Sequence, residues 1–211
     1  MSGQTPPPGL YRAKDWYTAR LRFVVDAAVR RRLSPDLFTA TGVGGGLVAA
    51  GLLAVSARHP HPLWSVAVAI ALAVRLAGAN LDGAVARARG LGRPWGFVLN
   101  EVGDRTSDLA PVLVLAACSG HPWGLAGLAG SFLPTCASLS VAAAGGPRLN
   151  GGPVGKTERC ALLVMVALLA PWWPVYSLTS ALIGVGGLVT AVVRLSAGAR
   201  LLGGRGPQAH R

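Results

Sequence analysis

Apolar residues recur along this chain in long runs separated by short polar turns. The runs cover 36–56, 63–82, 97–118, 123–144, 159–173 and 175–194. Most are close to the roughly 20 residues that a helix needs to cross a bilayer, although the fifth is shorter. Pro171 and Pro174 flank the Trp172-Trp173 pair and indicate a turn at a membrane interface, where tryptophan is favoured. The pattern predicts an all-α integral membrane protein with six transmembrane helices.

A different pattern precedes the first run. In 15–32, Trp16 and Phe23 fall on one side of a helical wheel, while Arg22 and Asp26 fall on the other. This predicts an amphipathic helix on the membrane surface. We expect a disordered leader over 1–14, without the apolar core of a signal peptide, a six-helix transmembrane domain over 33–198 and a disordered tail over 199–211.

Small residues crowd the start of the first apolar run, at Gly42, Gly44, Gly45 and Gly46. Glycine in a membrane helix lets the backbone of a second helix approach closely. We therefore expect this run to be a helix-packing surface.

The composition agrees with a membrane protein, since 52% of the residues are hydrophobic and only 13% are charged. The net charge of +12 is distributed unevenly, because alternate loops are basic and the others carry almost none. The basic residues of the first kind of loop are Arg30, Arg31, Arg32, Arg87, Arg89, Arg93, Arg148, Lys156, Arg159, Arg194, Arg200, Arg205 and Arg211. The positive-inside rule then predicts a multi-pass cell-membrane protein with both termini cytoplasmic. This distribution also argues against a nucleic-acid partner.

Cysteine and histidine give no sign of a metal or disulfide framework. Cys118, Cys136 and Cys160 are widely spaced within apolar runs and are typical of small core residues. The four histidines lie in loops or in the tail, without a zinc-binding spacing.

Acidic residues gather in one window, LDGAVARARGLGRPWGFVLNEVGDRTSD, residues 81–108. The chain has eight acidic residues, and four of them lie here: Asp82, Glu101, Asp104 and Asp108. On a helix that begins near Gly96, Asn100, Glu101, Asp104 and Asp108 fall at about 0°, 100°, 40° and 80°. They share one face, and Asp82 ends the preceding span. Two antiparallel helix ends would therefore present carboxylates to each other on the cytoplasmic side.

Carboxylate and amide oxygens without histidine or cysteine suit a hard cation, Mg²⁺ or Mn²⁺, as one ion or two. A simpler alternative is that the nearby arginines neutralise the acids and anchor the loop. The basic stretch NGGPVGKTER, residues 150–159, belongs to another cytoplasmic loop. Lys156 and Arg159 could hold a phosphate on an acceptor there, or act only as an ordinary positive anchor.

The window resembles the signature of the CDP-alcohol phosphatidyltransferases, D-x-x-D-G-x-x-A-R, eight residues, then G-x-x-x-D-x-x-x-D. The matching positions, with the spacer kept, are Asp82-Gly83, Ala86-Arg87, Gly96 and Asp104. Two positions depart from the signature, because Ala79 and Asn100 stand where the family has aspartates. The resemblance extends to the six-span layout and the N-terminal surface helix.

The resemblance implies a reaction in which an acceptor hydroxyl attacks the lipid-linked phosphate of a CDP-alcohol such as CDP-diacylglycerol, and CMP leaves. It implies that the polyol or polyol-phosphate acceptor and the lipid donor meet in the transmembrane domain, with two metal ions, in a homodimer. Asp82 would bind metal, and Asp104 would bind metal and act as general base. Gly83, Ala86 and Gly96 would leave room for the nucleotide, and Arg87 would contact phosphate.

The two departures bear on the metal site. One hypothesis is that Glu101 and Asp108 restore four carboxylates on the same helix face, while Asn100 keeps an amide oxygen for the cation. The stretch LNEVGDRTSD is similar to a branch of the family with the pattern N-E-x-x-D-x-x-S-D. The alternatives are a catalytically inactive family member and a small multi-span transporter.

Overall fold

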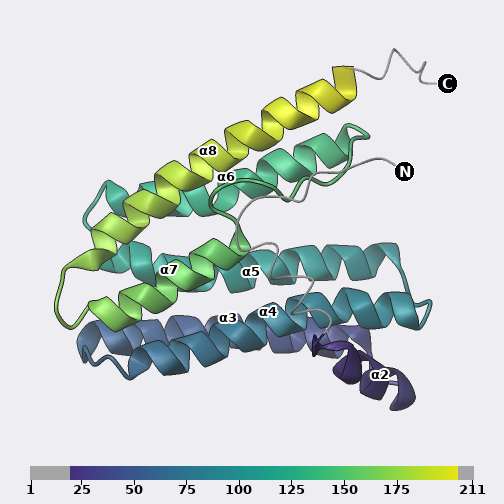
Figure 1. Ribbon diagram of the computed structural model, residues 1–211, viewed down its shortest axis with the longest axis horizontal. Helices are drawn as coiled ribbons and strands as arrows, with labels where there is room; N and C mark the ends of the chain where they lie inside the picture. Colours follow the sequence, from purple (N-terminus) through teal and green to yellow (C-terminus); the bar gives the residue numbers. More distant parts are fainter. Residues whose placement is uncertain (1–19, 204–211) are drawn as a thin grey trace.

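The computed structural model describes residues 20–203, which are mostly helical. The helices are α2 (Arg22–Arg30), α3 (Pro35–Arg58), α4 (Trp64–Ala88), α5 (Pro94–Cys118), α6 (Trp123–Ala143), α7 (Lys156–Leu169) and α8 (Val175–Gly203). Helices α3 to α8 run back and forth along a common direction, with α2 at one end (Figure 1). The predicted all-α class is confirmed.

Four helices, α3, α4, α6 and α8, are long and apolar enough to cross a membrane. Helix α5 is as long as α4, but it carries Glu101, Asp104, Arg105 and Asp108. Helix α7 has only 14 residues, fewer than the roughly 20 that span the hydrocarbon core. A multi-span membrane protein is thus supported, and the six-span arrangement stays a prediction.

The predicted surface helix falls partly on α2, which lies beside α4. Residues 15–19, the leader 1–14 and the tail beyond 203 lie outside the described residues. The last helix extends to Gly203, well past the predicted end at 194. Its final turns contain Ala199, Arg200, Leu201 and Leu202, all good helix formers.

Helix α4 also outlasts its predicted end at Asp82 and continues to Ala88. The residues after Gly83 favour a helix, and Val85 is completely buried. The connection to α5 is therefore a short turn, in which Gly90 adopts φ +62° before Pro94 begins the next helix. Asp82 lies within a helix and not at its end.

Helix α3 packs along both α4 and α5, which touch each other at few points. A Cβ at Gly45 would lie 2.8 Å from the Arg75 backbone nitrogen, and one at Gly46 would lie 2.6 Å from Ser107 Cβ. A Cβ at Gly42 would lie 3.3 Å from the backbone of α4, whereas one at Gly44 would have no neighbour within 4 Å. The predicted packing role is confirmed for three of the four glycines.

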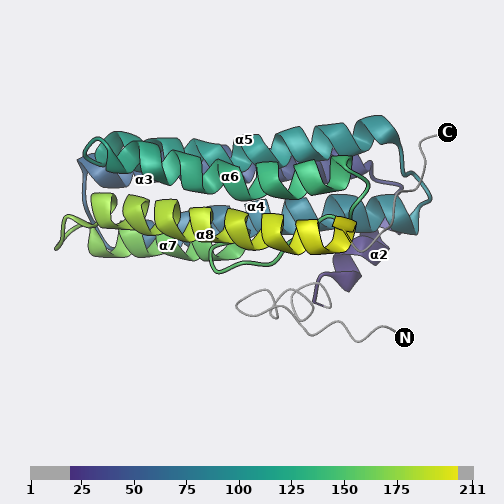
Figure 2. The same cartoon turned by 90° about the horizontal axis from the view of Figure 1, so that it is seen from above.

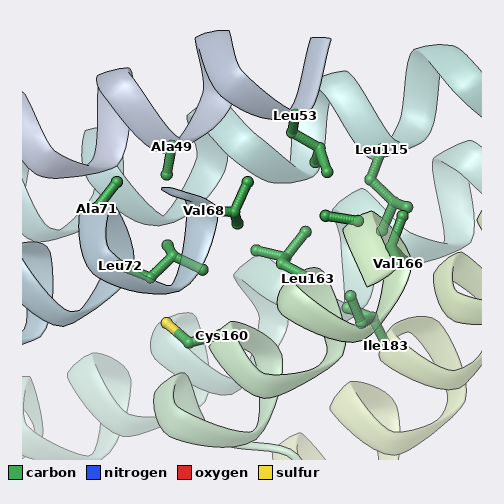
Figure 3. Packing of buried hydrophobic residues seen from close by; sticks show 11 residues of the cluster. Ala49, Leu53, Val68, Ala71, Leu72, Leu115, Cys160, Leu163, Val166 and Ile183 are labelled. Carbon is green, nitrogen blue, oxygen red and sulfur yellow. The ribbon is translucent and has the colours of Figure 1, made fainter. Parts of the chain in front are cut away.

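The remaining helices are seen best from above, where α5 and α6 form part of one layer and α7 and α8 part of the other (Figure 2). Helices α6 and α8 pack closely, and α7 packs against α4 and α8. Buried apolar side chains from five helices meet in one core, shown in Figure 3. The core comprises Ala49, Leu53, Val68, Ala71, Leu72, Leu115, Cys160, Leu163, Val166, Ala167 and Ile183.

The connections alternate between the two ends of the molecule (Figure 1). The α3–α4, α5–α6 and α7–α8 turns lie at one end. Helix α2 and the α4–α5 turn lie at the other end, where the α6–α7 loop also begins. Ser34 caps α3 at this second end by accepting a hydrogen bond from the Asp36 N–H.

Candidate active site

Three helices line a small polar pocket, which we call the acidic pocket. Its residues are Thr39, Gly42 and Val43 from α3, Ala79 and Asp82 from α4, and Asn100, Gly103, Asp104 and Ser107 from α5. The signature positions on α4 and α5 therefore face the same space. Helix α3 completes the pocket between them, a contribution that the spacing of the signature residues did not indicate.

Asp82 is held by neutral donors. The Thr39 hydroxyl donates to Oδ2 at 3.1 Å, and the Gly83 backbone N–H donates to Oδ1 at 2.5 Å. The side chain is almost fully buried. Both carboxylate oxygens are thus oriented by helices α3 and α4, and the described contacts include no ion pair to Asp82.

Asp104, in contrast, is surrounded by cations. Lys156 Nζ lies 2.7 Å from Oδ1. Arg75 Nη2 lies 3.8 Å from Oδ1, and Arg105 Nη2 lies 3.9 Å from Oδ2. Lys156 begins α7, so this contact brings the predicted basic loop to the acidic window. The cations around this carboxylate come from α4, from α5 itself and from α7.

Asp108 lies deeper, in a buried cluster of arginines. Arg75 Nη2 donates to Oδ1, and Arg159 Nη2 lies 3.2 Å from Oδ2. Arg105 Nη1 is 3.6 Å from the same oxygen. Arg75 also donates to the Ser107 hydroxyl and is fully buried. Asp108 is therefore neutralised by protein cations, and it does not line the acidic pocket.

Arg75 was not among the predicted site residues. A signal for it exists in the sequence, because Arg75 is the only basic residue in the apolar run 63–82. A charge within a membrane segment is costly and is usually paired or functional. The rule that identified the acidic residues as functional therefore also applies to Arg75, which pairs with Asp104 and Asp108.

Glu101 also faces away from the pocket. Arg105 Nε lies 3.2 Å from Oε1, and Arg148 Nη2 lies 2.5 Å from Oε2. The Arg148 guanidinium also sits 5.9 Å from the centroid of the Phe97 ring. Glu101 therefore fastens the α6–α7 loop to α5.

The four carboxylates consequently do not converge as expected. The shared face spans about 100°, and an arc that wide can contact several neighbouring helices. The side chains at about 0° and 40° line the pocket, and these are Asn100 and Asp104. The side chains at about 80° and 100° contact arginines instead, and these are Asp108 and Glu101. Within residues 20–203 no group of three or more His, Cys, Asp or Glu side chains could hold a metal ion.

The pocket nevertheless provides donors that fit a hard divalent cation. Asp82 and Asp104 supply carboxylate oxygens, and Asn100 supplies an amide oxygen. The hydroxyls of Thr39 and Ser107 lie among them. Two carboxylates and an amide are a modest donor set for one ion, and a sparse one for two.

The predicted nucleotide-binding residues lie between this pocket and the α4–α5 turn. Gly83 follows Asp82, and a Cβ there would lie 3.2 Å from Arg87 Nη1. Ala86 is half-buried and Arg87 is exposed. Gly96 occupies the first turn of α5, where a Cβ would meet the Arg93 side chain. Small residues and exposed guanidinium groups thus lie together near one end of the site.

No protein-family model matches the chain. It is 30% identical to the phosphatidylinositol phosphate synthase of Mycobacteroides abscessus, over 82% of this chain and 81% of that protein.

The solved structures that resemble the chain are of the same kind of enzyme as that relative. The phosphatidylinositol phosphate synthase of Mycobacterium tuberculosis with CDP-DAG bound has a TM-score of 0.68 and 26% identity, covering 88% of this chain and 96% of that one. The same enzyme with manganese and citrate has a TM-score of 0.68 and 25% identity, covering 88% and 92%.

The relatives and the residues of the acidic pocket agree with the signature read from residues 82–104. The chain belongs to the CDP-alcohol phosphatidyltransferase family, whose reaction transfers a substituted phosphate group from a CDP-alcohol to an acceptor hydroxyl with release of CMP.

Proposed function

We propose that this enzyme uses CDP-diacylglycerol as its donor and a polyol phosphate as its acceptor, and that transfer takes place at the acidic pocket. The observation that carries the proposal is that Asp82 and Asp104, the signature carboxylates present in the chain, line one pocket from α4 and α5. Support for the substrates comes from the CDP-DAG-bound enzyme of Mycobacterium tuberculosis and from the product named for the Mycobacteroides abscessus relative.

The donor would bind at the end of the site nearest the α4–α5 turn. Gly83, Ala86 and Gly96 leave room there for a nucleotide, and Arg87 offers an exposed guanidinium to its phosphates. A divalent cation held by Asp82, Asn100 and Asp104 would offset the pyrophosphate charge. The manganese-bound enzyme of Mycobacterium tuberculosis supports metal dependence.

Asp104 would act as the general base. Its carboxylate takes the proton of the acceptor hydroxyl as that oxygen bonds to the phosphorus next to the lipid. The bond from that phosphorus to the bridging oxygen breaks, and CMP leaves with the oxygen. Lys156, at 2.7 Å from Asp104, is the candidate contact for the acceptor's phosphate. Arg159 donates a hydrogen bond to Asp108, which lies outside the pocket lining, and would therefore stabilise the site without contacting the acceptor.

The apolar helices and the distribution of arginine indicate how the chain lies in the membrane. We infer six membrane-embedded helices over 33–198, with α5 and α7 shielded by the four apolar spans, and with α2 on the surface. The α4–α5 turn would face the cytoplasm of a cell membrane, because arginine is concentrated at that end. Homodimerisation is an expectation of the family resemblance.

An assay of CMP release tests the function. Full-length protein in detergent or nanodiscs receives CDP-diacylglycerol with Mg²⁺ or Mn²⁺ and, separately, inositol phosphate, inositol, glycerol phosphate or glycerol. We expect CMP release with a phosphorylated polyol, and its loss on chelation. Asp104→Asn, which keeps the side-chain volume, should lower the rate by at least about a thousandfold.

Preference for an unphosphorylated acceptor would overturn the acceptor assignment and leave the transferase intact. Absence of CMP with every acceptor, from protein that is folded and still binds CDP-diacylglycerol, would instead favour the inactive family member, to which Ala79 and Asn100 point.

A further inference from the structure

The acidic pocket has less negative charge than a site for two divalent cations needs. Its lining includes two carboxylates, Asp82 and Asp104. Ala79 lines the same pocket with only a methyl group, and Asn100 contributes a neutral amide. Two divalent ions bring four positive charges, so two carboxylates leave half of that charge uncompensated before substrate binds.

The two carboxylates also differ in their surroundings. Asp82 accepts hydrogen bonds from the neutral Thr39 hydroxyl and the Gly83 N–H. Asp104 contacts Lys156 at 2.7 Å and lies within 4 Å of Arg75 and Arg105. A second divalent cation at Asp104 would be repelled by these neighbours, whereas the described ion pairs place no protein cation within 4.0 Å of Asp82.

Lys156 reaches this position because its loop is firmly attached. The Val154 N–H donates to the Thr190 hydroxyl, and the Gly155 N–H donates to the Glu158 carboxylate. Lys156 is the first residue of α7 and points its ammonium group at Asp104. An ammonium held in place next to a carboxylate supplies a fixed positive charge at that point.

We propose that the acidic pocket binds a single divalent cation centred on Asp82, and that the Lys156 ammonium beside Asp104 supplies the second positive charge. The proposal rests on the proposed function, since it concerns the metal used at the same site. It explains Ala79, Asn100 and Lys156 together: where two ligands for a second ion are missing, a protein cation lies against the remaining carboxylate.

Counting bound Mn²⁺ tests this directly. Full-length protein in nanodiscs is titrated with Mn²⁺, and free Mn²⁺ is measured by electron paramagnetic resonance. We expect one Mn²⁺ per chain in the unaltered protein and two in the Ala79→Asp/Asn100→Asp variant. Lys156→Met should tighten Mn²⁺ binding by about tenfold or more, because a repelling charge is removed. Arg148→Gln, which removes a cation from Glu101 outside the pocket, is the matched control and should leave affinity unchanged.

Two Mn²⁺ per chain in the unaltered protein, none at millimolar Mn²⁺, or an unchanged affinity in Lys156→Met would each overturn the proposal. If the double variant does not fold, Asn100→Asp alone, which preserves volume, should bind Mn²⁺ at least about tenfold more tightly than the unaltered protein, and equal affinity would count against the proposal. CMP release by the unaltered protein separates the two ideas. One bound ion without CMP release refutes the proposed function only, and CMP release with two ions refutes only the single-ion site.

Discussion

Asp108 is buried against the guanidinium groups of Arg75 and Arg159, which are themselves buried. Removing one partner from such a cluster leaves a charge without compensation in a low-dielectric interior. We expect Arg75→Gln to lower the free energy of unfolding by about 3–5 kcal/mol, measured by denaturation of the detergent-solubilised protein.

The exposed pair of Arg93 and Asp36 is the control for that prediction. Arg93→Gln should cost no more than about 1 kcal/mol, because exposed ion pairs contribute little. An equal decrease in the free energy of unfolding of the two variants would show that burial of the ion pair does not determine the loss of stability.

The two kinds of acid in the window should differ in their effect on activity. Asp104→Asn changes the pocket itself, whereas Glu101→Gln changes a contact to Arg105 and Arg148 outside it. We expect Glu101→Gln to lower CMP release by about tenfold at most, far less than Asp104→Asn. If the two lost activity equally, Glu101 would be a ligand, as the hypothesis of compensation holds.

At the residue scale, helical spacing was enough to predict that Asn100 and Asp104 lie near Asp82. Spacing could not predict which way Glu101 and Asp108 turn, because that depends on arginines contributed by α4, α7 and the α6–α7 loop. The contact between Lys156 and Asp104 joins residues 52 positions apart. No local pattern contains that information.

Helix α3 provides a matched pair of glycines for a test of packing. A methyl group at Gly45 would lie 2.8 Å from the Arg75 backbone nitrogen, whereas one at Gly44 would meet nothing within 4 Å. We expect Gly45→Ala to destabilise the protein by about 1–3 kcal/mol and to lower activity, because α4 carries both Arg75 and Asp82. Gly44→Ala should be neutral or slightly stabilising. Thermal unfolding and CMP release measured on both variants check this, and a stable, active Gly45→Ala would contradict it.

At the scale of elements, the apolar runs predicted the six helices α3 to α8, of which α7 is short, because a chain in a membrane must pair its backbone polar groups within each segment. Their ends were less predictable. Helix α4 continues beyond Asp82 because Val85 finds a buried position, which hydropathy alone does not reveal. Sequence order also suggested that α4 and α5 face each other directly, whereas α3 lies against both.

For the whole molecule, the distribution of arginine is the clearest large-scale feature. The α4–α5 end of the described chain has Arg87, Arg89 and Arg93, and Arg148 follows α6 at the same end, whereas the opposite end has Arg58 alone among its turns. Basic loops stay on the cytoplasmic side during insertion. The acidic pocket, which opens among helices carrying these arginines, would then receive the water-soluble polyol phosphate from the cytoplasm and release CMP into it.

Labelling of single cysteines tests this orientation. In a background with Cys118, Cys136 and Cys160 replaced, His61→Cys and Gly92→Cys place one thiol in an exposed turn at each end. A membrane-impermeant maleimide added to intact cells should label His61→Cys, and it should label Gly92→Cys only after the membrane is permeabilised. Each variant must retain CMP release for the result to count. Labelling of Gly92→Cys in intact cells, with His61→Cys protected, would reverse the orientation and would put the site on the face of the membrane away from a cytoplasmic polyol phosphate.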